Sequence, residues 1–156
     1  MMKFLTATFG CAIVFAQMPM THALKFSSNL SICTQMINYT VGSLKAIPNT
    51  TNVRFKTTTI DPSNYTSVPT GKTKFYQFSF GGAGAGNILR SPKMMEILSD
   101  RVLNACGEPA VLTFGISNTD AFEMYGWVNG KTKRFTCYPS TRNLPSKISW
   151  GQRVCL

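Results

Sequence analysis

In the segment FEMYGWVNGKTKRF, two aromatic residues at alternate positions precede an Asn-Gly pair and an arginine follows it. Asn-Gly between two apolar runs predicts a hairpin with a type I′ turn, whose two-residue loop places Tyr125, Trp127 and Arg134 on one face. Flat rings beside a guanidinium can stack on sugars and attract anions. With Lys131 and Lys133 nearby, the sequence predicts a binding surface. Alternatively, another element covers this face and both rings belong to the core.

Carboxylates supply most of the catalytic chemistry that the sequence allows. The single histidine, His22, falls within the N-terminal signal predicted below, so the commonest general base and the Ser-His and Cys-His nucleophile pairs are missing. Asp120 and Glu123 flank the start of a predicted strand and can form the acid pair of a hydrolase of extracellular polysaccharide. Acids at such positions also serve as turn and surface groups. A hydrolase is therefore the alternative to a non-catalytic binding module.

The glycine-rich segment SFGGAGAGNILRSPKMME lies between a predicted strand and a predicted helix. A dinucleotide fingerprint needs a glycine at its sixth position, where this chain has Asn87 or Leu89, depending on the starting glycine. We therefore expect no nucleotide cofactor. The backbone amides, with Arg90 and Lys93 nearby, can form a small anion-binding nest; the other interpretation is a flexible connection of small residues.

An export signal is predicted at residues 1–23. Lys3 precedes the apolar run Phe4–Ala16, and small residues before a cleavage point after Ala23 suit signal peptidase. Residues 24–156 then form a single exported domain, secreted or periplasmic. No later segment has the roughly 18 apolar residues of a membrane-spanning helix.

The predicted mature chain is strongly basic. Without Lys3 it holds 15 Lys and Arg against 6 Asp and Glu, a net charge of +9. Such a charge favours an anionic polysaccharide or cell-surface polymer as partner. Its other interpretation is solubility alone.

Four cysteines remain in the predicted mature chain, and in an oxidising compartment they suggest two disulfides with three possible pairings. We favour Cys33 with Cys106 and Cys137 with Cys155, because the second pair closes a local loop and ties down the C-terminal segment. A zinc site is the alternative, but the chain has no C-x-x-C pair, so we expect no metal.

The elements predict an α+β domain: a mostly antiparallel sheet of four to five strands, one main helix packed on a face, and two disulfides. The main helix is predicted at 91–105, with Ser91 as its N-cap. Apolar residues three and four apart also favour a helix over 24–47, where an initial strand is the alternative. The predicted strands are 53–60, 73–80, 110–117, 122–128 and 131–138.

The order of the motifs MMEILSDRVLNAC, AVLTFGISNTD, YGWVNGK, RFTCY and SWGQRVCL resembles that of small exported cyanobacterial proteins of unknown function. The resemblance covers roughly the last 70 residues and contains no catalytic motif. It implies a bacterial periplasmic or secreted setting, and it assigns a role to no residue.

Overall fold

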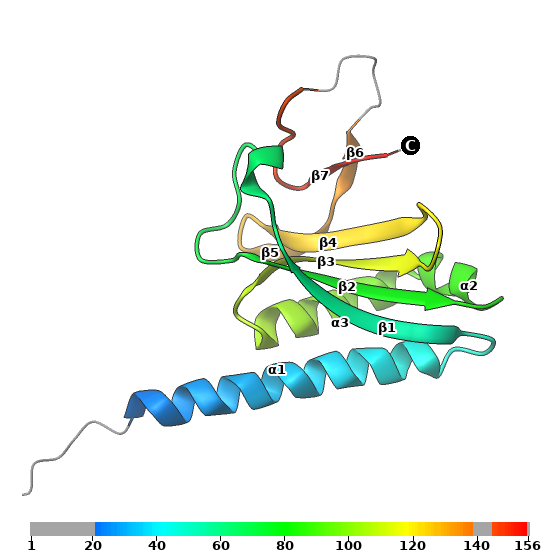
Figure 1. Cartoon of the computed structure of the whole chain (residues 1–156), viewed down its shortest axis with the longest axis horizontal. Coiled ribbons are helices and arrows are strands. Elements are labelled where there is room, and N and C mark those ends of the chain that lie inside the picture. The colour runs from blue at the N-terminus through cyan, green and yellow to red at the C-terminus, as the bar shows by residue number, and fades with distance from the viewer. Residues whose placement is uncertain (1–20, 139–144, 156) are drawn as a thin grey trace, which may run out of the picture.

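A five-stranded sheet with two long helices on one of its faces makes up most of the molecule (Figure 1). The computed structural model describes residues 21–138 and 145–155, with side chains from residue 30 onward. Its helices are α1 Thr21–Lys45, α2 Ala85–Leu89, α3 Pro92–Ala105 and the 3-10 turn η1 Pro62–Asn64. Its strands are β1 Thr51–Thr59, β2 Lys74–Gly81, β3 Pro109–Ile116, β4 Phe122–Val128, β5 Lys131–Arg134, β6 Thr136–Tyr138 and β7 Gln152–Val154.

The predicted fold class is confirmed: the strand order is β1-β2-β3-β4-β5, and every neighbouring pair is antiparallel except β2 and β3. β2 and β3 are parallel because α2 and α3 form the crossover between them. Of the predicted signal, residues 1–20 lie outside the described part of the chain, and the predicted cleavage point falls in the first turn of α1. None of the helices described is long and apolar enough to cross a membrane.

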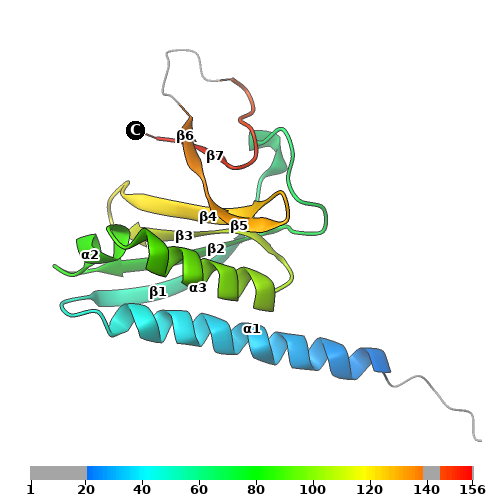
Figure 2. The ribbon, with the colours of Figure 1, turned by 180° about the vertical axis from the view of Figure 1, so that it is seen from behind.

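The main core lies between the sheet and the helices α1 and α3, which cover the same face (Figure 2). The alternate side chains Tyr76, Phe78 and Phe80 of β2 point into this core, as the period of a strand requires. A disulfide between Cys33 and Cys106 joins α1 to the end of α3, so the predicted pairing is confirmed. We call this side of the sheet the helix face.

The hairpin of β4 and β5 has the predicted turn and register. Asn129 and Gly130 have φ angles of 54° and 73°, the left-handed values that a type I′ turn needs. Tyr125 pairs with Arg134. The predicted continuation to Tyr138 is wrong in part, because β6 leaves the hairpin after Phe135 and pairs with β7 instead.

The other side of the sheet, which we call the open face, is covered only at one end. There Trp150 contacts Phe135 and Tyr65, with ring centroids 5.2 Å and 5.1 Å apart. The predicted disulfide between Cys137 and Cys155 is confirmed and holds β6 beside β7. The C-terminal segment therefore covers the opposite face from the one that carries Tyr125.

The glycine-rich segment forms a closely packed junction. Its backbone runs against the turn between α1 and β1, and a Cβ on Gly84 would lie 2.2 Å from the carbonyl oxygen of Pro48. The following residues form α2, which buries Ala85 and Ile88. Small residues are needed here because the backbone of this segment approaches the turn between α1 and β1 closely.

Candidate functional site

Tyr125 lies beneath α3 and is 1% exposed. Its hydroxyl donates to the carbonyl oxygen of Pro92 at 3.2 Å, and burial raises its pKa to about 12. Of the two interpretations of this face, the one that places the ring in the core is correct for Tyr125, because α3 packs over it.

The other predicted binding residues do not form one surface. Trp127 is half-buried against the main core, and its indole ring lies 5.0 Å from the Lys72 ammonium. Arg134 shares the helix face with it, whereas Lys131 and Lys133 pair with Val128 and Gly126 and so belong to the opposite face. A cluster of all five predicted residues does not exist in this fold.

Glu123 is the partner that holds Arg134. The guanidinium of Arg134 donates to Oε2 of Glu123 at 2.7 Å and to Oε1 at 2.5 Å, and Nη2 of Arg153 lies 3.5 Å from Oε2. Asp120 and Glu123 line one hollow together with Arg153, beside the Cys137–Cys155 disulfide. Both oxygens of Glu123 are thus occupied by guanidinium groups, which is the arrangement of a structural ion pair.

No group of three or more metal-ligating side chains occurs among the residues described. The four cysteines of the predicted mature chain are bonded in pairs.

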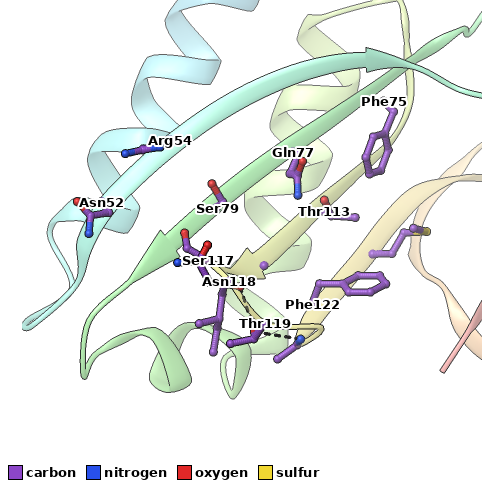
Figure 3. Close-up of a pocket in the computed structure, with 14 residues that line it drawn as sticks. Asn52, Arg54, Phe75, Gln77, Ser79, Thr113, Ser117, Asn118, Thr119 and Phe122 are labelled. Atoms are coloured by element: carbon purple, nitrogen blue, oxygen red, sulfur yellow. Dashed lines mark hydrogen bonds between the residues drawn. The ribbon is translucent and has the colours of Figure 1, made fainter. Parts of the chain in front are cut away.

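A hollow of about 470 Å³ lies on the uncovered part of the open face (Figure 3). Its walls combine amide and hydroxyl side chains with two phenyl rings, one thioether and one guanidinium. The lining residues are Asn52, Arg54, Phe75, Gln77, Ser79, Thr113, Gly115, Ile116, Ser117, Asn118, Thr119, Ala121, Phe122 and Met124. No carboxylate is among them.

The register of the sheet arranges these side chains in rows. One row of partners crosses four strands on the open face: Arg54, Ser79, Gly115 and Phe122. At the usual strand spacing it spans about 14 Å. Arg54 lies at one end of the row and Phe122 at the other. Gly115, which has no side chain, leaves space above the sheet beside the ring. In Figure 3 the side chains of Gln77, Ser79 and Thr113 lie between those of β1 and β4.

Thr113 is the residue of the hollow with a buried hydroxyl that lacks a hydrogen-bond partner in the described chain. It is 3% exposed, and no group of the described chain forms a hydrogen bond with its hydroxyl. The other two buried polar side chains, Thr40 and Ser99, each donate to a carbonyl oxygen one helical turn back. An unpaired buried hydroxyl costs free energy, and Thr113 places such a group in the floor of the hollow.

Three more buried polar atoms lack a partner in the described chain, on Thr50, Trp127 and Arg153. None of these residues lines the hollow on the open face. Arg153 lines the hollow of Asp120 and Glu123 instead, so Thr113 is the unpaired group of the hollow on the open face.

The hollow is positive because its one charged lining residue is Arg54. Arg54 is exposed, and no carboxylate of the described residues forms an ion pair with it. Lys56 follows two positions along the same strand and pairs with Gln77, so its side chain belongs to the same face. Two cations therefore stand on the edge strand beside the hollow.

Sequence reasoning missed this site, although a signal for it was present. The alternation in β2 that places Tyr76, Phe78 and Phe80 in the core also places Gln77 and Ser79 together on the other face.

Comparisons of the chain with models of protein families, with curated proteins and with solved structures found no match.

Proposed function

We propose that the protein is an exported, non-catalytic module that binds an extracellular glycan in the hollow on the open face. The observation that carries this proposal is the polar hollow itself, which has the buried and unpaired Thr113 hydroxyl in its floor. Sugar hydroxyls are both donors and acceptors, and they match the amides of Asn52 and Gln77 as well as a threonine hydroxyl. The ring of Phe122 offers an apolar surface to the C–H face of a sugar.

A glycan fits this hollow better than a peptide strand does. The floor of the hollow is the interior of the sheet, where the peptide groups of β2 and β3 already pair with their neighbours. A bound peptide strand obtains much of its affinity from backbone hydrogen bonds to a free sheet edge. Sugar hydroxyls instead find partners in the side chains.

The test is a binding screen of the protein without residues 1–23 against neutral and acidic polysaccharides at low and moderate salt. Thr113→Val keeps the shape of the side chain and removes its hydroxyl, so we expect weaker binding with an unchanged fold. The matched control is Thr132→Val, which removes a hydroxyl on the helix face, where Thr132 donates to Asp100. Binding that responds equally to both changes, or no binding at all, contradicts the proposal.

The hydrolase alternative has one observation in its favour, since Asp120 and Glu123 line the same hollow. It requires one of these groups to give up a proton to the leaving oxygen. The pairing of Glu123 with two guanidinium groups opposes that role. We expect incubation with polysaccharides to release no new reducing ends; release that disappears in both Asp120→Asn and Glu123→Gln would support the hydrolase.

A further inference from the structure

The geometry points to acidic sugars as the ligand class, with Arg54 holding the carboxylate of a uronic acid unit. This inference rests on the proposed function and specifies its ligand. The hollow contains a guanidinium without a carboxylate in its lining. A guanidinium and a carboxylate form two parallel hydrogen bonds, which makes arginine selective for planar anions.

The row of side chains from Arg54 to Phe122 determines the order in which a bound sugar chain would contact them. From Arg54 the row passes the hydroxyl of Ser79 and the bare backbone of Gly115 before it reaches the ring of Phe122. A span of about 14 Å holds more than one sugar unit. A carboxylate at Arg54 therefore leaves a neighbouring unit over Gly115 and Phe122, with the Thr113 hydroxyl in the adjoining row.

Gly115 keeps this path clear. A Cβ at this position would already lie 3.4 Å from the Cβ of Phe122, so a larger side chain would fill the floor beside the ring. The strand backbone tolerates a β-branched residue, since valine is favoured in strands. Gly115→Val thus fills the site, and we expect it to weaken binding of acidic and neutral sugars alike.

Arg54 is also placed so that its charge acts on the ligand rather than on the fold. It is exposed on the edge strand, and no ion pair of the described residues uses it. Arg101 offers a matched cation on α3, where its guanidinium lies 5.2 Å from the ring of Tyr39. Arg54→Gln and Arg101→Gln change the net charge equally on opposite sides of the molecule.

The experiment compares a galacturonic acid oligomer with the same oligomer after reduction of its carboxyl groups, by isothermal titration calorimetry. We expect the acidic oligomer to bind at least about tenfold more tightly. Arg54→Gln should remove that difference, Arg101→Gln should keep it, and Gly115→Val should weaken both ligands.

Three outcomes overturn parts of this account in distinguishable ways. Equal binding of both oligomers, unchanged by Arg54→Gln, rejects the acidic ligand and leaves glycan binding in place. If the preference for the acidic oligomer decreases equally in Arg54→Gln and Arg101→Gln, it arises from general charge attraction. That outcome also rejects the role of Arg54. Absence of binding by both oligomers and by the neutral polysaccharides of the screen rejects the proposed function itself.

Discussion

Gln77 and Thr113 are register partners on the parallel strands β2 and β3, and both side chains line the hollow on the open face (Figure 3). Their neighbours in sequence, Tyr76, Phe78 and Phe114, point the other way into the main core. The same two strands thus supply the centre of the core on one face and a polar floor on the other.

Thr113→Val should raise the free energy of unfolding by about 1 kcal/mol, because it removes a buried hydroxyl that has no partner in the described protein. The measurement is urea denaturation of both proteins. Thr40→Val is the control, since the hydroxyl of Thr40 donates to Met36 at 2.9 Å, and its removal should bring no such gain. A less stable Thr113→Val protein would show that the hydroxyl has an internal role.

Gly84→Ala should destabilise the protein by about 1–3 kcal/mol through overpacking against Pro48 and Thr50. The backbone of Gly84 is helical, with φ of −76°, so the substitution tests the close contact alone. Gly42→Ala is the control within α1, where a Cβ meets nothing within 4 Å, and we expect a gain of about 0.5–1 kcal/mol. Thermal denaturation should show a lower stability for Gly84→Ala and a higher stability for Gly42→Ala than for the unsubstituted protein. Equal stability of the two variants would mean that the junction accommodates the added methyl group without strain.

Alkaline pH should weaken the fold through Tyr125. The ordinary tyrosine pKa is 10.0, and burial raises the pKa of Tyr125 in the folded state to about 12. Between these values the unfolded chain has lost the proton that the folded protein still holds. The free energy of unfolding therefore falls as pH rises from about 10 towards 12, and this contribution is fully present below about pH 10.

Tyr125→Phe should flatten that slope without abolishing it, because burial also raises the pKa of Tyr65 and Tyr76. The control is Tyr39→Phe: a hydrogen bond from Arg101 lowers the pKa of Tyr39, so its removal should not flatten the slope. The measurement is a series of urea denaturation curves from about pH 8 to 11. An identical slope in the Tyr125→Phe and unsubstituted proteins would contradict the burial of this hydroxyl.

Mild reduction should open the Cys137–Cys155 disulfide first. Cys137 is exposed, whereas Cys33 and Cys106 are 9% and 5% exposed. The Cys33–Cys106 bond also spans 73 residues against 18, so on the loop-entropy scale its loss costs about 4 kcal/mol and that of the other about 3 kcal/mol. Alkylation and peptide mass mapping follow the order; early labelling of Cys33 would contradict it.

The sequence allowed a good prediction of the local structure, because local signals control it. Asn129-Gly130 determines the turn and hence the register of the hairpin. The apolar spacing of α3 predicts its length, although the Ser91 hydroxyl donates to the carbonyl oxygen of Asn87 instead of capping the helix. The two disulfides followed from the expected compartment and the position of the cysteines.

The site was not predictable in the same way, because it depends on which face each helix covers. Aromatic or apolar residues occupy both faces of the hairpin, so its pattern did not reveal that α3 lies over Tyr125. The hollow draws its residues from four strands, and its rows exist only once β2 and β3 are known to be parallel. That pairing joins segments separated by two helices, which no local pattern specifies.

The most direct test of the binding site is backbone amide chemical-shift mapping during titration with the galacturonic acid oligomer. We predict that the largest shifts occur at Arg54, Ser79, Thr113 and Phe122, with no comparable change along α3. Shifts concentrated around Trp127 and Arg134 on the helix face, or spread over every lysine of the surface, would contradict a ligand site on the open face of the sheet.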